Sequence, residues 1–118
     1  MLIVDDQECF RRAGQTLVSA TAGFEAVGES ASAEEALEAA VQLRPDLCLV
    51  DVRMPGLDGF ETSRRLRALL PDSVVVLVSA DPEPDADQVE ASGAATFVPK
   101  EGLNRSMLQT LWQQHGAR

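Results

Sequence analysis

The chain has 118 residues, of which 45% are hydrophobic and only 4% aromatic, and its formal net charge at pH 7 is −9. This length suits one domain with a buried core. The negative charge argues against direct binding of nucleic acid by this domain. No apolar run approaches the length of a membrane span, and no signal peptide is visible, so we expect no membrane partner.

The first part of the chain alternates between strand-like and helix-like segments. The apolar run Leu2–Asp5 is predicted to be a short buried strand. In Glu8–Thr21 the apolar residues recur at the spacing of one helix face. A second strand is predicted over Phe24–Gly28. Ser32 and Glu35 have the spacing of a capping box and should open a second helix, which a proline ends.

The alternation continues to the C-terminus. A third strand is predicted over Leu47–Asp51, and in the loop Met54–Gly59 the residue Asp58 is placed to cap a third helix. The mainly β-branched run Val74–Ser79 predicts a central strand covered on both faces. The chain closes with a polar helix, a strand and a helix, over Glu83–Ser92, Thr96–Val98 and Leu103–Gln114. Such alternation predicts a parallel sheet with helices on both faces.

Charged residues follow three of these strands. Asp5 and Asp6 end the first, Asp51 ends the third, and Lys100 follows the fifth. In a parallel sheet these ends meet at one edge, where ligands bind in open α/β folds. Three crowded carboxylates repel one another unless a cation lies among them. This pattern therefore indicates a site for a small divalent ion, with an anion such as a phosphoryl group bridging it to the lysine.

Each of these features also has an ordinary explanation. An Asp-Asp pair is usually a solvated turn, and Lys100 after a strand is more often simply exposed. Ser79 could merely end its strand. Only the combination, in this order on strand ends, predicts a site.

These residues resemble the receiver domain of bacterial two-component response regulators. The resemblance covers essentially the whole chain and rests on four motifs, Ile3-Val4-Asp5-Asp6, Leu49-Val50-Asp51-Val52-Arg53-Met54-Pro55-Gly56-Leu57-Asp58-Gly59, Val78-Ser79-Ala80 and Phe97-Val98-Pro99-Lys100. Val27-Gly28-Glu29-Ser30 and Pro99-Lys100-Glu101 further resemble the NarL/FixJ branch, whose receivers usually precede a DNA-binding helix-turn-helix domain.

The resemblance implies a flavodoxin-like (βα)5 fold, which is a three-layer α/β sandwich around a five-stranded parallel sheet of order 2-1-3-4-5. We therefore expect residues 1–118 to form one receiver domain, with no output domain in this chain. We expect a phosphoacceptor signalling domain and not an enzyme, since its only catalysis would be its own phosphorylation and slow autodephosphorylation.

The resemblance also implies a Mg²⁺-dependent reaction. Asp51 would accept a phosphoryl group from a phosphohistidine of a sensor histidine kinase or phosphotransfer protein. Asp6 would bind Mg²⁺ directly, Asp5 mostly through water, and Asp51 and the backbone carbonyl of Arg53 would complete the metal site.

By the same resemblance, Lys100 would pair with one phosphoryl oxygen, and the Ser79 hydroxyl would donate a hydrogen bond to another. Phe97 occupies the position of an aromatic residue that changes rotamer on phosphorylation, although a core phenylalanine is an equal alternative. The resulting switch would control an output domain or a partner, with transcription as the expected output. The last helix could serve a homodimer, or simply pack on the core.

Cys9 and Cys48 are the only cysteines, and neither is expected to form a disulfide, which fits a reducing cytoplasm. Three rival functions fit the sequence less well. A phosphatase of the haloacid dehalogenase type needs a second Asp at the position of Arg53. A flavin module fits poorly with four Phe, one Trp and no phosphate loop after the first strand. A degenerate receiver that acts purely by docking is disfavoured by the intact acids and lysine.

Overall fold

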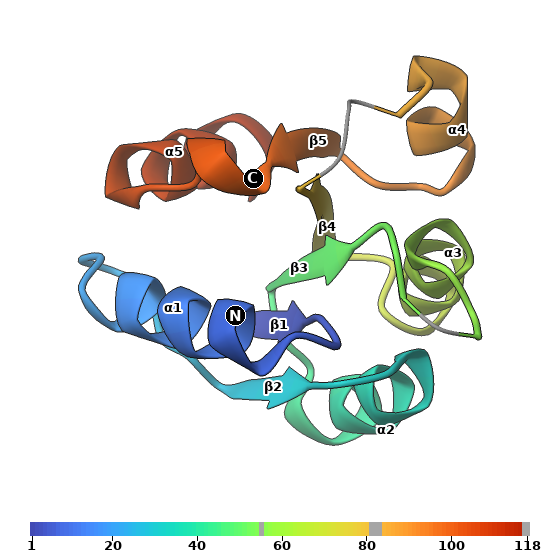
Figure 1. Ribbon diagram of the computed structural model, residues 1–118, viewed down its shortest axis with the longest axis horizontal. Coiled ribbons are helices and arrows are strands. Elements are labelled where there is room, and N and C mark those ends of the chain that lie inside the picture. The colour runs from blue at the N-terminus through green and yellow to red at the C-terminus, as the bar shows by residue number, and fades with distance from the viewer. Residues whose placement is uncertain (55, 81–83, 117–118) are drawn as a thin grey trace.

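Five parallel strands form one sheet in the order β2-β1-β3-β4-β5 (Figure 1). The computed structural model describes residues 1–54, 56–80 and 84–116. The strands are β1 (Leu2–Val4), β2 (Gly28–Ser30), β3 (Leu47–Asp51), β4 (Val74–Ser79) and β5 (Thr96–Pro99). The predicted flavodoxin-like sheet order is confirmed. Within the described residues, every helix is too short or too polar to span a lipid bilayer.

Helices cover both faces of this sheet (Figure 1). On one face lie α1 (Glu8–Ser19) and α5 (Arg105–Leu111). On the other lie α2 (Ala33–Leu43), α3 (Gly59–Leu69) and α4 (Ala86–Ala91). A short 3-10 helix, Lys100–Gly102, follows β5, and a π-helical turn, Trp112–Gly116, follows α5.

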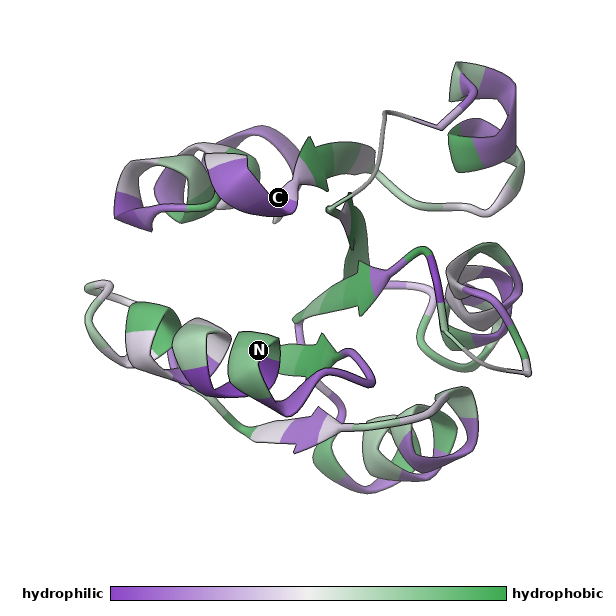
Figure 2. Cartoon of the chain, in the orientation of Figure 1, coloured by the Kyte–Doolittle hydropathy of each residue, from purple (hydrophilic) through white to green (hydrophobic). Residues whose placement is uncertain are grey.

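β1, β3 and β4 are mainly apolar because both faces of the sheet are covered there, whereas the edge strand β2 is polar (Figure 2). Alternate side chains of β1, β3 and β4 enter two separate cores. In β1, Ile3 packs with residues of α1 and α5, whereas Leu2 and Val4 pack with residues of α2 and α3. β3 and β4 are buried along their whole length, including Asp51 and Ser79 at their carboxyl ends.

The two predicted helix caps are confirmed. The Ser32 hydroxyl accepts a hydrogen bond from the backbone N–H of Glu35 at 3.2 Å. A carboxylate oxygen of Asp58 accepts one from the N–H of Glu61 at 2.9 Å. Each cap satisfies a donor that a helix start would otherwise leave without a partner, so these two helix starts are fixed by local chemistry.

The second strand was predicted at the wrong residues. Phe24 lies in a turn, where its N–H donates to the carbonyl of Thr21, and its side chain packs against the core. The pairing of β2 with β1 begins only at Gly28, which is aligned with Leu2. The apolar residues before Gly28 therefore belong to a loop packed on the core. The strand itself lies at the edge of the sheet, where polar residues are tolerated.

The fourth helix is shorter than predicted, and the last one starts later than predicted and continues as the π-helical turn to Gly116. α4 covers only Ala86–Ala91, and the predicted first residue of this helix, Glu83, lies outside the described residues. α5 begins after Asn104, whose side chain accepts a hydrogen bond from the N–H of Met107 at 2.8 Å. Leu108 and Leu111 are buried, and Trp112 packs partly buried against the same core, which favours core packing for this helix.

Candidate functional site

The acids that end β1 and β3 meet because these strands are neighbours in the sheet. Val4 is paired with Val50, so Asp5 and Asp51 follow side by side. Asp6 lies next to them, and one carboxylate oxygen from each of Asp5, Asp6 and Asp51 can be chosen so that all three lie within 4.8 Å of one another. The structure thus brings together the three acids that the sequence singled out.

These acids differ sharply in exposure. Asp5 is 0% exposed and Asp51 is 5% exposed, whereas Asp6 faces solvent. One oxygen of each buried acid is held by a backbone N–H, that of Gln7 for Asp5 at 2.8 Å and that of Arg53 for Asp51 at 3.2 Å. The other oxygen of each, Oδ2, is the one that lies nearer the lysine of the site.

Lys100 lies at the start of the short 3-10 helix after β5 and reaches over to both buried acids. Its Nζ lies 2.6 Å from Oδ2 of Asp5 and 3.6 Å from Oδ2 of Asp51. Only 12% of its side chain is exposed. One cation thus lies against two buried carboxylates, while Asp6 adds a third negative charge at the open side.

The pKa of Asp51 reflects this imbalance. Burial, followed by the negative charge of Asp5, raises the pKa of Asp51 from 3.8 to about 6. The N–H of Arg53 and the charge of Lys100 act in the opposite direction, but they do not outweigh burial. Lys100 alone therefore does not balance the negative charge of the site.

The residues present fit a hard divalent cation. Oδ2 of Asp5 is buried and, although Lys100 lies close to it, no donor is aligned on it as a hydrogen bond. Carboxylate oxygens are the ligands that Mg²⁺ prefers, and Mg²⁺ retains several waters, which the exposed side at Asp6 would admit. Asp5, Asp6 and Asp51 would hold the ion.

The other predicted site residues take different places. Ser79 is buried at the end of β4, beside β3, where Asp51 is paired with Val78. Arg53 is exposed in the loop after β3. Phe97 lies in β5 and packs, partly buried, against the core on the side of α2 and α3.

Two residues of the lysine's surroundings were not singled out from the sequence. Oε1 of Gln7 accepts a hydrogen bond from Nζ of Lys100 at 3.4 Å. The same nitrogen lies 4.3 Å from the centroid of the Phe10 ring. Phe10 was predicted only as part of an apolar helix face, and its position four residues after Asp6 was the one available signal.

Arg11 and Gly59 also support the site in ways that the sequence motifs did not reveal. Nη1 of Arg11 donates to the backbone carbonyl of Asp5 at 2.8 Å, and its Nε donates to Glu29 at 2.9 Å. Arg11 therefore connects α1 to the end of β1 and to β2. At Gly59 a Cβ would collide with the backbone carbonyl of Asp51, so only glycine lets α3 begin this close to β3.

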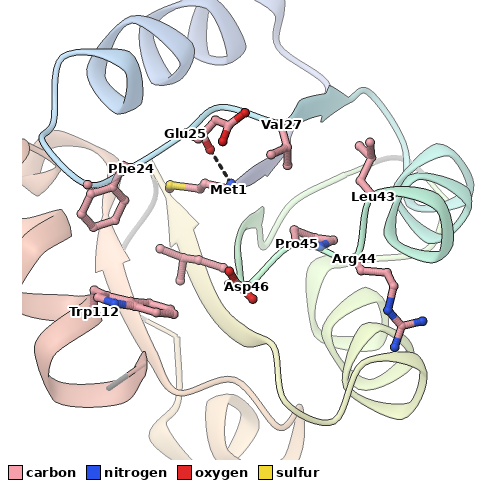
Figure 3. Close-up of a pocket in the computed structure, with 11 residues that line it drawn as sticks. Met1, Phe24, Glu25, Val27, Leu43, Arg44, Pro45, Asp46 and Trp112 are labelled. Carbon is pink, nitrogen blue, oxygen red and sulfur yellow. Dashed lines mark hydrogen bonds between the residues drawn. The ribbon is translucent and has the colours of Figure 1, made fainter. Parts of the chain in front are cut away.

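A pocket of about 320 Å³ lies elsewhere, at the amino ends of the strands (Figure 3). Phe24 and Trp112 line one side of it, and Leu43 and Arg44 line the other. The N-terminal ammonium of Met1 donates to the carbonyl of Glu25 at 2.6 Å beside it. This pocket contains none of the predicted site residues, so the acidic edge remains the candidate site.

Comparison with known proteins identifies related chains. Residues 1–111 match the family model described as the response regulator receiver domain. The response regulator GacA of Pseudomonas viridiflava is 34% identical over 112 residues, which cover 94% of this chain and 52% of GacA. A protein-glutamate methylesterase/protein-glutamine glutaminase of Alkalilimnicola ehrlichii is 35% identical over 101 residues, which cover 84% of this chain and 26% of that protein.

Solved structures give the same result. The signal receiver domain of the putative response regulator NarL from Mycobacterium tuberculosis superposes with a TM-score of 0.86 and 31% identity, covering 99% of this chain and 95% of that chain. The chemotaxis protein CheY4 of Vibrio cholerae superposes with a TM-score of 0.82 and 26% identity, covering 97% of this chain and 95% of that chain. The chain spans about half the length of the GacA relatives that it matches.

Proposed function

We propose, because the chain belongs to the response regulator receiver domain family of two-component systems, that Asp51 accepts a phosphoryl group from a sensor histidine kinase or phosphotransfer protein. The observation that carries this proposal is the geometry of the strand ends. Three carboxylates converge within 4.8 Å, and Lys100 lies against the two that are buried. Phosphoryl transfer needs this kind of positioning and charge neutralisation more than covalent help from the protein.

Asp51 is the proposed nucleophile. Its Oδ1 is engaged by the N–H of Arg53, while Oδ2 lies toward Lys100. A carboxylate oxygen of Asp51 forms a bond to phosphorus as the phosphorus–nitrogen bond of the donor phosphohistidine breaks, and the imidazole keeps the electron pair and takes up a proton. The ionised form of Asp51 is the reactive one, and a pKa of about 6 still leaves it mostly ionised at neutral pH.

A bound Mg²⁺ would supply charge neutralisation between the acids and the incoming phosphoryl group. Asp5, Asp6, Asp51 and the backbone carbonyl of Arg53 are the groups we propose to hold it. Lys100 and the Ser79 hydroxyl would bind phosphoryl oxygens. The positions of these two residues support their roles. Ser79 ends β4 and Lys100 follows β5, and both strands lie on the same side of β3, which ends in Asp51.

The consequence of phosphorylation would be a shift between two conformations of the domain. Ser79 would engage the phosphoryl group at the end of β4, and Phe97 on the adjacent β5 would change its rotamer. A space of about 280 Å³ between α4 and β5, which Phe97 helps to line, leaves room for such a change. Phe97 is only partly buried, which supports the same idea.

The proposal extends to what the receiver controls. Residues 1–118 would form a receiver, acting in the cytoplasm on an output domain or a partner, or as a homodimer. GacA is named a response regulator, whereas the methylesterase relative pairs a matching segment with a different activity. We favour control of transcription, because the motifs after the second and fifth strands resemble the NarL/FixJ branch.

Binding of beryllofluoride, which mimics a phosphoryl group on a carboxylate, tests the proposal without a kinase. Fluorine NMR should show a bound species only when Mg²⁺ and beryllofluoride are both present. Asp51→Asn should abolish that signal, while Asp58→Asn, at an acid that only caps α3, should retain it. A bound signal that survives Asp51→Asn would overturn the assignment.

A further inference from the structure

The ammonium group of Lys100 has two kinds of neighbour. On one side are acids, with Oδ2 of Asp5 at 2.6 Å and Oδ2 of Asp51 at 3.6 Å. On the other are uncharged groups of α1 and the turn before it. Oε1 of Gln7 accepts a hydrogen bond at 3.4 Å, and the centroid of the Phe10 ring lies 4.3 Å away. The face of an aromatic ring attracts a cation within about 6 Å of its centroid.

The Phe10 ring is fixed by packing that does not involve the acids. It lies on α1 and packs, partly buried, against the core beneath that helix. One turn later, Gly14 is buried, and a Cβ there would lie 2.6 Å from Cδ1 of Ile3. The missing side chain lets α1 lie close to β1. The packing of the ring beside the strand ends therefore involves none of the acids.

Packing that is separate from the acids matters because carboxylates alone do not fix the direction in which a lysine side chain approaches them. The lysine side chain is flexible, and its ammonium is a point charge without directional preference. A divalent cation among the carboxylates would also compete with Lys100 for Asp5 and Asp51 and would repel it. The attraction of an uncharged ring is not lost in that competition.

We propose that Phe10 is a positioning residue for Lys100, whose ring face keeps the ammonium at the strand ends when a cation occupies the acids. The importance of this for phosphoryl uptake rests on the proposed function. The ring contact itself does not, so the two can be tested separately.

The first test is made on the metal-free protein. Protons above the face of a ring are shielded, so the ε-methylene protons of Lys100 should resonate upfield of ordinary lysines in the wild-type protein. Phe10→Tyr keeps the ring face and should keep the shift. Phe10→Leu keeps an apolar side chain and should lose it. The matched control is Phe24→Leu, because Phe24 is also partly buried against the same core but lies at the amino ends of the strands.

The second test measures phosphorylation by acetyl phosphate at saturating Mg²⁺. Phe10→Leu should lower the rate roughly three- to tenfold, as expected for loss of a partly desolvated cation–ring contact. Phe10→Tyr should restore the rate, and Phe24→Leu should leave it near the wild-type value. If Phe10→Leu does not fold, Phe10→Met provides the same comparison.

Two results would overturn the proposal. One is an ordinary Lys100 resonance in the wild-type protein, and the other is an equal loss of rate in Phe10→Leu and Phe24→Leu, which would indicate a general packing effect. An upfield resonance that Phe10→Leu abolishes, in a wild-type protein that acetyl phosphate cannot phosphorylate, would support the positioning contact and refute only the proposed function.

Discussion

Nζ of Lys100 lies 2.6 Å from Oδ2 of Asp5, so the cation that follows β5 compensates the most deeply buried acid at the end of β1. These residues come from opposite ends of the chain, and their contact spans the middle of the sheet. Because Asp5 is already paired and Asp6 is exposed, the acids should contribute unequally when a metal ion binds.

Removing the two adjacent acids one at a time should therefore have different effects. We expect Asp6→Ala to weaken Mg²⁺ binding more than Asp5→Ala, because Asp6 is proposed to bind the ion directly and Asp5 mostly through water. Asp6→Ala also relieves repulsion among carboxylates, which favours the metal-free fold, whereas Asp5→Ala in addition removes the ion pair with Lys100. Calorimetric titration of both variants with Mg²⁺ gives the comparison, and equal losses would contradict the assigned roles.

The raised pKa of Asp51 predicts a particular dependence of stability on pH. A carboxyl whose pKa is about 6 in the folded protein and 3.8 in the unfolded chain binds its proton more tightly when folded. Its contribution to the free energy of unfolding therefore decreases as the pH rises from about 4 to about 6. Asp51→Asn removes this ionisation.

We expect Asp51→Asn to stabilise the metal-free protein at pH 7, by at most about 3 kcal/mol. The gain should shrink toward zero as the pH falls from about 6 to about 4. Urea unfolding of both proteins across this range measures the difference, and a gain that does not vary with pH would show that Asp51 titrates normally.

Gly59 offers a test of how closely α3 must approach β3. In Gly59→Ala the new Cβ would meet the carbonyl of Asp51 and would lie 2.7 Å from Cα of Val52. Both are backbone atoms, which cannot rotate away, so we expect a loss of about 3 kcal/mol in the free energy of unfolding. Gly102→Ala is the matched control. Its nearest neighbours are 3.8 Å away, and stability should be unchanged or slightly higher.

The charge of the chain predicts its behaviour with nucleic acid. At −9, the 118-residue chain should not bind duplex DNA at physiological salt, whether or not it is phosphorylated. Fluorescence anisotropy with a labelled duplex at two salt concentrations tests this. Binding that persists at the higher concentration would place a nucleic-acid site within these residues.

The parallel sheet and the gathering of the acids at one edge could be predicted because they follow from local patterns. Apolar runs that end in acids mark the carboxyl ends of strands, and in a parallel sheet those ends share one edge. The caps at Ser32 and Asp58 were equally local. That the first and third strands are neighbours, which puts Asp5 beside Asp51, was implied only by the family resemblance.

The errors and omissions share a physical cause, which is packing between segments distant in sequence. Phe24 belongs to a loop. Its side chain packs against the core, but the pairing of β2 with β1 starts later, at Gly28. The apolar pattern cannot distinguish these cases. Likewise, an apolar helix face predicts that Phe10 is inward, but not that its ring meets Lys100.

The central claim, that Asp51 is a phosphoryl acceptor, is tested most directly by mass spectrometry. After incubation with Mg²⁺ and acetyl phosphate, the intact protein should gain the mass of one phosphoryl group, at Asp51. The gain should require Mg²⁺ and should be absent in Asp51→Asn. An unchanged mass for the folded wild-type protein, or a modification that remains in Asp51→Asn, would contradict the account.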